Sequence, residues 1–197
     1  MTTGQSIKKF IYSIWMFIQK LKGSKDKIIF NKENKKPLSS FYSLKSTLNN
    51  GNAFLFETLK GKKVLIVNTA SDCLYTKQYD ELEKLYELYK DKLIVLAFPA
   101  NDFGEQEKAD DSSIVQFCKI NFGVSFPLMK KSVVIKNDNQ NEVYKWLTNG
   151  NLNGWNNQQP KWNFSKYLID ENGILTHYFE PMLSPLSKVV RDIIIAD

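Results

Sequence analysis

Two short apolar segments, Val64–Asn68 and Leu93–Phe98, restrict the fold of this chain more than any other feature of its sequence. Each has the length and composition of a buried strand. Between them, residues 76–90 place large apolar and aromatic side chains on one helical face and most charged side chains elsewhere. A strand, helix, strand unit of this kind predicts two parallel strands joined by a right-handed crossover.

From residue 41 onward the sequence continues to alternate between strand and helix patterns. The other predicted elements are helices over residues 112–121, 141–147 and 185–195, and a hairpin with strands over residues 164–170 and 174–179. A length of 197 residues with 43% hydrophobic content supplies the core of one globular domain. We therefore predict an α/β fold in which residues 41–197 form one domain, with helices around a central mixed β-sheet.

The positive charge of the chain is concentrated in its N-terminal extension. The net charge is +6, but residues 1–36 carry nine lysines against Asp26 and Glu33, which leaves the remainder at −1. Arg191 is the only arginine, whereas proteins that recognise bases and phosphates rely on bidentate guanidinium groups. We therefore expect no nucleic-acid partner.

Residues 1–40 are predicted to be a basic amphipathic extension followed by a linker. Apolar side chains recur at helical spacing over residues 7–22 with lysines beside them, as in helices that lie on anionic membrane surfaces. The uncharged run 10–19 is shorter than the roughly 17 to 25 apolar residues of a membrane span, and no signal-peptide cleavage site follows it. Membrane-surface contact is one interpretation of this segment, and a disordered or packing tail is the other. A cytoplasmic or membrane-associated location is favoured over secretion.

Cys73 follows the first predicted strand and opens the predicted helix over residues 74–90. The amide groups and dipole at a helix start favour an anion and lower the pKa of a cysteine below its free value of about 8.5. Open α/β sheets also place their chemistry at the carboxyl ends of parallel strands. Cys118 is the only other cysteine and His177 the only histidine, so the sequence predicts neither a disulfide scaffold nor a metal site.

The residues that follow Cys73 narrow its chemistry. Cys73-Leu74-Tyr75-Thr76 has the Cys-x-x-Cys spacing of dithiol reductases, but threonine replaces the second thiol. A disulfide partner for Cys73 must come from elsewhere in the chain, and Cys118 is the only candidate. A thiolate without a neighbouring thiol is suited to attack an oxidant and to pass through a sulfenic acid. The pattern therefore indicates peroxidase chemistry.

Three separated motifs resemble those of the glutathione peroxidase family and occur in the same order. They are Asn68-Thr69-Ala70-Ser71-Asp72-Cys73, the segment from Phe98 to Glu107, and Lys161-Trp162-Asn163-Phe164. The segment from Phe117 to Pro127 also resembles the cysteine-using members of that family. The resemblance extends from about Phe41 to the C-terminus, and it implies a thioredoxin-like fold.

The resemblance implies a role for each matching residue. Cys73 falls at the peroxidatic position, and Gln106, Trp162 and Asn163 complete the catalytic tetrad of the family. The neutral N–H groups of these three residues can stabilise a thiolate and orient a peroxide. Cys118 matches the resolving cysteine of the two-cysteine members, which implies recycling by thioredoxin rather than by glutathione and no bound cofactor. A small buried side chain with no redox role is the alternative for Cys118.

Two neighbours of Cys73 depart from the family pattern. Leu74 stands where the family usually has glycine, so the turn is expected to lose backbone freedom. Asp72 would raise the pKa of the thiol unless its side chain points to solvent. Neither departure removes a residue of the catalytic tetrad. Both are therefore expected to change the rate of the reaction rather than its class.

The sequence thus predicts a thiol peroxidase that reduces hydrogen peroxide or organic hydroperoxides and is regenerated by an external thiol, thioredoxin or glutathione. A peroxiredoxin is disfavoured because the Pro-x-x-x-Thr-x-x-Cys pattern is missing before Cys73. The alternative from another class is a membrane-tethered redox sensor or relay that is oxidised without turnover. The asparagine-rich segment 149–160 is interpreted as a loop near the site that shapes peroxide access. Nothing in the sequence requires more than a monomer.

Overall fold

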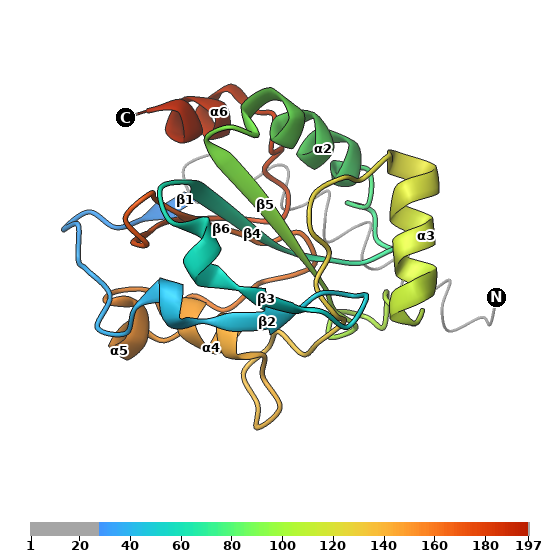
Figure 1. Cartoon of the computed structure of the whole chain (residues 1–197), viewed down its shortest axis with the longest axis horizontal. Helices are drawn as coiled ribbons and strands as arrows, with labels where there is room; N and C mark the ends of the chain where they lie inside the picture. Colours follow the sequence, from blue (N-terminus) through green and yellow to red (C-terminus); the bar gives the residue numbers. More distant parts are fainter. Residues whose placement is uncertain (1–27, 197) are drawn as a thin grey trace.

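The computed structural model describes residues 28–196, and its centre is a five-stranded mixed sheet (Figure 1). The strand order is β1-β7-β6-β4-β5. β4 and β5 run parallel, and the other neighbouring pairs in this sheet are antiparallel. The strands, in this order, span Ile28–Phe30, Leu175–Phe179, Lys166–Ile169, Lys63–Thr69 and Leu93–Pro99.

Helices and a small hairpin cover the two faces of the sheet (Figure 1). One face packs against three helices, which are α2 (Gln78–Tyr89), α3 (Asp111–Phe122) and α6 (Lys188–Ile195). The other face carries shorter elements, which are α4 (Glu142–Leu147), α5 (Gly150–Asn153), the 3-10 turns η2 (Phe41–Ser43) and η3 (Phe56–Leu59), and the hairpin of β2 (Lys45–Thr47) and β3 (Ala53–Leu55). The predicted α/β fold with a central mixed sheet between helices is confirmed.

The strand β4 shows why this sequence forms a buried strand. All of its residues are buried. Val64 and Ile66 join the hydrophobic cluster on the α4 face, whereas Leu65 and Val67 join the cluster on the α2 face. A strand with neighbours on both edges and cover on both faces needs apolar side chains in both directions, which produces a continuous apolar run rather than an alternating one.

The predicted strand, helix, strand unit is present with the expected pairing. β4 and β5 are parallel, with Val64 opposite Ile94, and α2 lies between them in the chain. The next helix, α3, is capped by Asp110, whose carboxylate accepts the Ser113 N–H at 2.8 Å. Such a cap satisfies an amide that has no partner inside the helix. The predicted hairpin forms β6 and β7.

The helix after Cys73 begins later than predicted. The sequence predicts a start at Leu74, but residues 74–77 form turns and α2 starts at Gln78. The reason is Thr76, whose hydroxyl accepts the Cys73 N–H at 3.0 Å and donates to the Ala70 carbonyl oxygen at 2.9 Å. Side-chain hydrogen bonds of this kind compete with the first helical turn. The prediction that Cys73 opens the helix is therefore wrong, and its activation must come from the turn itself.

The described part of the predicted linker includes a strand. Ile28–Phe30 forms β1, which pairs antiparallel with β7, so that Ile28 lies opposite Phe179. A three-residue edge strand is too short to give a periodic sequence signal. The amphipathic helix predicted over residues 7–22 lies outside the described residues. Within residues 28–196, no helix is long and apolar enough to span a bilayer.

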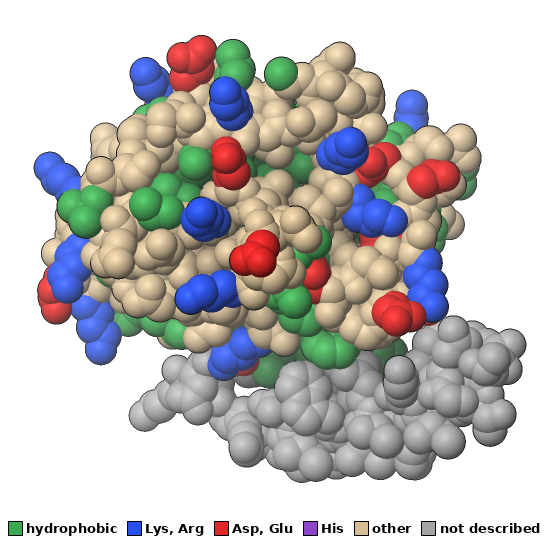
Figure 2. Space-filling model, turned by 90° about the horizontal axis from the view of Figure 1, so that it is seen from below, with side chains coloured by type: hydrophobic (Ala, Val, Ile, Leu, Met, Phe, Trp, Pro, Cys, Tyr) green, Lys and Arg blue, Asp and Glu red, His purple; other side chains and the backbone are tan. Residues whose placement is uncertain are grey.

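One face of the molecule is shown with its side chains coloured by type in Figure 2. Lysines and carboxylates are interspersed over the described part of this face rather than grouped by sign. A clustered basic stripe is the electrostatic footprint of nucleic-acid binding. This face does not have that footprint.

Candidate active site

Cys73 lies half-buried in the turn at the carboxyl end of β4. The N–H of Tyr75 points to Cys73 Sγ, with a nitrogen to sulfur distance of 3.4 Å. An N–H donated to sulfur favours the thiolate over the thiol. Thr76 occupies the place of a second reductase thiol, and its hydroxyl instead closes the turn through its bonds to Cys73 and Ala70. The local structure thus supports one reactive thiol rather than a dithiol.

The two unusual neighbours of Cys73 fit this turn. Leu74 is 57% exposed and is not among the non-glycine residues with positive φ. The turn therefore does not need a glycine at this position, and the expected loss of backbone freedom causes no strain. The side chain of Asp72 is exposed, which is the condition under which its carboxylate disturbs the thiol least.

Gln106 lies in the loop that follows β5. Gly104 and Glu105, just before it, both have positive φ, at 65° and 54°. This conformation is easy for glycine and uncommon for glutamate. The loop then meets the turn of Cys73, because the Asp72 N–H donates to the backbone carbonyl oxygen of Gln106 at 3.0 Å.

Trp162 and Asn163 immediately precede β6 and are held against β4 by Asn68. The Asn68 side-chain amide donates to the Trp162 carbonyl oxygen at 3.0 Å, and the Phe164 N–H donates to the Asn68 carbonyl oxygen at 2.6 Å. Phe164 is fully buried and has a positive φ of 66°. A left-handed backbone at a large aromatic residue is strained and is retained only where the surroundings impose it. The segment is therefore fixed in one geometry.

Gln106, Trp162 and Asn163 converge in space. Asn163 Nδ2 donates to Gln106 Oε1 at 3.0 Å. Because Gln106 Oε1 is the acceptor, the Nε2 hydrogens of Gln106 take no part in this bond. A Cβ placed on Gly104 would lie 3.6 Å from the Trp162 ring and 3.7 Å from Gln106 Cγ, and the Phe103 and Trp162 ring centroids are 5.5 Å apart.

The four residues predicted to form the tetrad thus come from three neighbouring strand ends at one edge of the sheet. β4 and β5 end there because they are parallel, and β6 begins there because it is antiparallel to β4. Asn163 is hydrogen-bonded to Gln106, the Trp162 ring faces Gly104 in the same loop, and the hydrogen bond from Asp72 joins this loop to the turn of Cys73. Such a group of neutral N–H donors can stabilise a thiolate and the oxygen that leaves a peroxide.

Cys118 lies in a different setting, inside α3. It is fully buried, and both cysteines are free thiols. Burial, and to a smaller extent the nearby Glu107 carboxylate, raise the pKa of the Cys118 thiol and the Tyr79 hydroxyl lowers it, with a net pKa of about 11. Cys73 packs at the border of the same hydrophobic cluster. In this reduced form, Cys118 is the less reactive of the two thiols.

A comparison with protein-family models identifies residues 41–148 as a glutathione peroxidase domain. The chain belongs to the glutathione peroxidase family. It is 44% identical over 150 residues to glutathione peroxidase-like peroxiredoxin 2 of Saccharomyces cerevisiae, covering 76% of this chain and 92% of the relative. It is 47% identical over 148 residues to glutathione peroxidase-like peroxiredoxin GPX5 of Chlamydomonas reinhardtii, covering 75% and 90%. Family membership confirms the predicted peroxidase, an oxidoreductase that acts on peroxide.

Solved structures agree with this assignment. The crystal structure of Trgpx in apo form is 35% identical, with a TM-score of 0.61, and the match covers 80% of this chain and 94% of that one. A thiol:disulfide interchange protein of the thioredoxin family from Chlorobium tepidum shares the fold, with a TM-score of 0.55 at 15% identity over 82% of this chain and 94% of that one. The predicted thioredoxin-like fold is confirmed.

Glu107 is a site residue that the sequence analysis did not single out. It follows Gln106 and is 1% exposed. Its Oε2 accepts both the N–H and the hydroxyl hydrogen of Ser71, each at 2.8 Å. The partner lies in a different motif of the peroxidase domain, so no local sequence pattern could have shown this contact.

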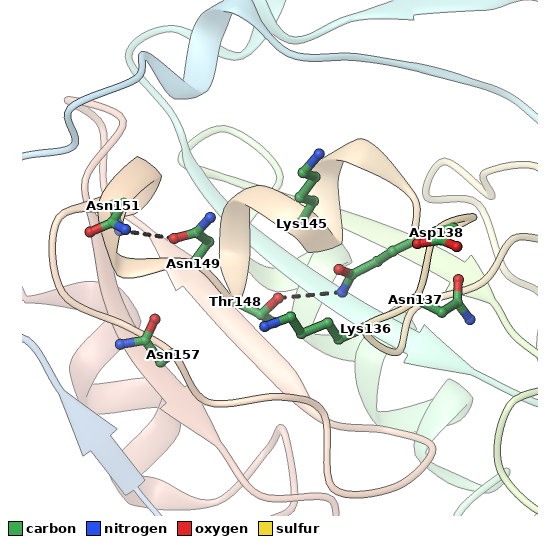
Figure 3. Close-up of a pocket in the computed structure, with 9 residues that line it drawn as sticks. Lys136, Asn137, Asp138, Lys145, Thr148, Asn149, Asn151 and Asn157 are labelled. Carbon is green, nitrogen blue, oxygen red and sulfur yellow. Dashed lines mark hydrogen bonds between the residues drawn. The ribbon is translucent and has the colours of Figure 1, made fainter.

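The asparagine-rich segment 149–160 lines part of a polar cavity of about 570 Å³ (Figure 3). The lining side chains are amides, lysines, a hydroxyl and a carboxylate, from Lys136, Asn137, Asp138, Gln140, Lys145, Thr148, Asn149, Asn151 and Asn157. None of the four tetrad candidates lines this cavity. The cavity therefore gives no support to the prediction that this segment shapes peroxide access.

The described residues contain no metal centre. Among residues 28–196, no three histidine, cysteine, aspartate or glutamate side chains lie close enough together to hold a metal ion.

Proposed function

We propose that this peroxidase works through two thiols, with Cys73 as the peroxidatic residue and Cys118 as the resolving residue. The observation that carries the proposal is the hydrogen-bonded pair of Gln106 and Asn163 and its connection, through Asp72, to the turn of Cys73. This assembly supplies oriented donors beside the only half-buried thiol of the described residues.

In the first step, the Cys73 thiolate attacks one oxygen of the hydroperoxide and the O–O bond breaks. Cys73 becomes a sulfenic acid, and the departing oxygen takes up a proton and leaves as water or an alcohol. The Tyr75 N–H supports the thiolate, and the free amide hydrogens of Gln106 can donate to the departing oxygen. These steps need protein side chains and an external thiol, with no bound cofactor.

In the second step, the Cys118 thiol condenses with the sulfenic acid of Cys73, which forms a disulfide and releases water. A disulfide needs Cα atoms within about 7 Å of each other, and we expect α3 to open locally so that the buried Cys118 can reach Cys73. The end of α3 is suited to this change, since Lys119, Ile120 and Asn121 are exposed and Ile120 is 80% accessible. Segments with few buried contacts open at the lowest cost.

In the third step, an external dithiol of the thioredoxin type reduces the disulfide and returns both cysteines to thiols. A dithiol is favoured over glutathione because it resolves an intramolecular disulfide without a second external molecule. The substrate class is small hydroperoxides, either hydrogen peroxide or an organic hydroperoxide. The acting unit is the domain over residues 41–197, together with β1.

A coupled assay tests this function. Full-length protein, thioredoxin, thioredoxin reductase and NADPH are mixed with hydrogen peroxide, and NADPH oxidation is followed. We expect many turnovers per protein molecule, and slower turnover when glutathione and glutathione reductase replace the thioredoxin system. A single stoichiometric oxidation followed by no further NADPH consumption would instead support the redox sensor.

The basic segment over residues 7–22 is proposed to contact anionic membrane surfaces. Its lysines would meet lipid headgroups, and its apolar side chains would enter the interface. Co-sedimentation with phosphatidylserine vesicles tests this, comparing the full chain with a variant that lacks residues 1–24. Equal binding of the two proteins would refute the proposal. Light scattering on the same samples tests the expected monomer.

A further inference from the structure

Glu107 is a buried carboxylate that joins the two loops of the candidate active site. It lies directly after Gln106, and its side chain reaches Ser71, two residues before Cys73. Its Oε2 accepts both hydrogens that Ser71 offers, at 2.8 Å each, and its backbone N–H donates to Asn101 Oδ1 at 2.9 Å. The carboxylate is thus fixed at both its backbone and its side chain.

The contact of Glu107 is one of two adjacent links between these loops. Ser71 is bound by the Glu107 side chain, and the next residue, Asp72, is bound by the Gln106 carbonyl oxygen at 3.0 Å. Two consecutive residues of the Cys73 turn are therefore attached to two consecutive residues of the Gln106 loop. Glu107 accepts two hydrogen bonds from Ser71, whereas the Gln106 carbonyl oxygen accepts one from Asp72, so the link through Glu107 is the more extensive one.

The fold retains Glu107 at an energetic cost. Burial raises the pKa of its carboxyl, and the hydrogen bonds from Ser71 and the charge of Lys131 offset this rise only in part. Among residues 28–196, Glu107 Oε1 is buried and accepts no well-directed hydrogen bond, although the Ala109 N–H is near enough to lower the pKa. Native proteins satisfy most buried polar atoms, so an exception at this place calls for a functional reason.

We propose that Glu107 is a positioning residue that holds the Cys73 turn at a fixed distance from Gln106. Peroxide then meets the thiolate and the Gln106 amide at the same time. The inference rests on the proposed function, because it assigns Glu107 to the first step of that reaction. It predicts that length and acceptor geometry matter at this position, and that the charge itself matters less.

Three substitutions separate length from charge. Glu107→Gln keeps the length and one acceptor oxygen, Glu107→Asp keeps the charge but is too short to reach Ser71, and Glu107→Ala removes both. Each is made in a Cys118→Ser background, so that only Cys73 reacts. Two rate constants are measured for each protein, the oxidation of Cys73 by hydrogen peroxide in a stopped-flow instrument and its alkylation by iodoacetamide. Alkylation needs the thiolate but not the alignment with Gln106.

We expect Glu107→Ala and Glu107→Asp to lose about 30-fold or more in the peroxide rate, since a misplacement of about 1 Å can cost roughly 100-fold. Their alkylation rates should change by less than about threefold, and Glu107→Gln should retain most of the peroxide rate. Parallel losses in both rates would overturn the proposal, as would full activity in Glu107→Asp with none in Glu107→Gln.

A second variant keeps the test decisive if Glu107→Ala does not fold. Ser71→Ala removes the hydroxyl partner of Glu107 and keeps the backbone N–H. We expect it to lower the peroxide rate by about threefold to tenfold with unchanged alkylation, and an unchanged peroxide rate would contradict the proposal. If the parent protein with intact Glu107 is not oxidised at Cys73 by peroxide, the proposed function itself fails. If it is oxidised and the Glu107 variants match it, only this inference fails.

Discussion

Cys118 belongs to a hydrophobic cluster that Cys73 borders, and the two cysteines lie in opposite environments. Cys73 is half-buried in a turn, with the Tyr75 N–H at its sulfur. Cys118 is fully buried within a regular helix, where burial raises its pKa to about 11. The first environment favours a thiolate that peroxide can reach, and the second keeps a thiol protonated and out of reach. In the proposed two-thiol mechanism, this difference would make Cys73 react first and Cys118 second.

The largest expected effect comes from removing each thiol in turn. Cys73→Ser should lower the rate at which the first equivalent of hydrogen peroxide is consumed by at least about 1,000-fold, since a hydroxyl is a far weaker nucleophile than a thiolate. Cys118→Ser should leave this first oxidation intact and abolish thioredoxin-coupled turnover. Single-turnover peroxide consumption and coupled NADPH oxidation measure the two effects. If both variants lost the first oxidation to the same extent, the two thiols would not have different roles.

The difference in reactivity between the thiols should also appear without peroxide. With a pKa of about 11, only about one Cys118 thiol in ten thousand is ionised at pH 7. We expect iodoacetamide to modify Cys73 at least about 100 times faster than Cys118 in the reduced native protein. Mass spectrometry of timed samples gives both rates. In urea, where α3 unfolds, the two rates should approach each other. Similar rates in the native protein would show that burial does not protect Cys118.

The donors beside Cys73 are expected to act on the first step alone. Gln106→Ala and Asn163→Ala should each lower the rate of Cys73 oxidation by about 100-fold, as for other preorganised donors. The double variant should lose much less than the product of the two losses, because the two side chains bind each other. Asn157→Ala, an asparagine of the polar cavity, is the matched control and should leave the rate unchanged. Multiplicative losses in the double variant would mean that the pair does not act as a unit.

The smallest expected effect is on stability at alkaline pH. The pKa of Cys118 is raised from 9.0 to about 11 in the folded protein, so the unfolded chain loses this proton first. The protonated Cys118 thiol contributes about 2 to 3 kcal/mol to the free energy of unfolding. This contribution is fully present below about pH 9 and is lost as the pH rises to about 11. Urea unfolding of the parent protein and of Cys118→Ala between pH 8 and 11 measures this loss. The tyrosines contribute equally in both proteins. The two pH dependences should therefore differ only by the contribution of Cys118. Superimposable curves would contradict the raised pKa.

The sequence was sufficient for the main features of this comparison. The apolar run over Val64–Asn68 predicted the strand that precedes the turn of Cys73, because a strand buried on both faces needs apolar side chains throughout. The motif around Trp162 predicted which residues converge near that strand end. The predicted helix over residues 112–121 is present as α3 and carries Cys118. Local pattern and motif therefore placed Cys118 on its helix and Cys73 just after its strand.

Features that depend on distant or unusual contacts were not predictable. The start of α2 moved to Gln78 because the Thr76 hydroxyl closes a turn, which a helix propensity does not reveal. The left-handed backbone of Phe164 is imposed by its surroundings rather than by its residue type. Glu107 bonds to Ser71 across two motifs, so its role became visible only once both loops were placed in space.

The most direct test of the two-thiol account is a disulfide map after a single oxidation. Reduced protein is treated with one equivalent of hydrogen peroxide, alkylated, digested without reduction and analysed by mass spectrometry. The account predicts a peptide pair joined through Cys73 and Cys118 as the main product. Cys73 found as sulfenic or sulfinic acid, with Cys118 alkylated as a free thiol, would contradict it.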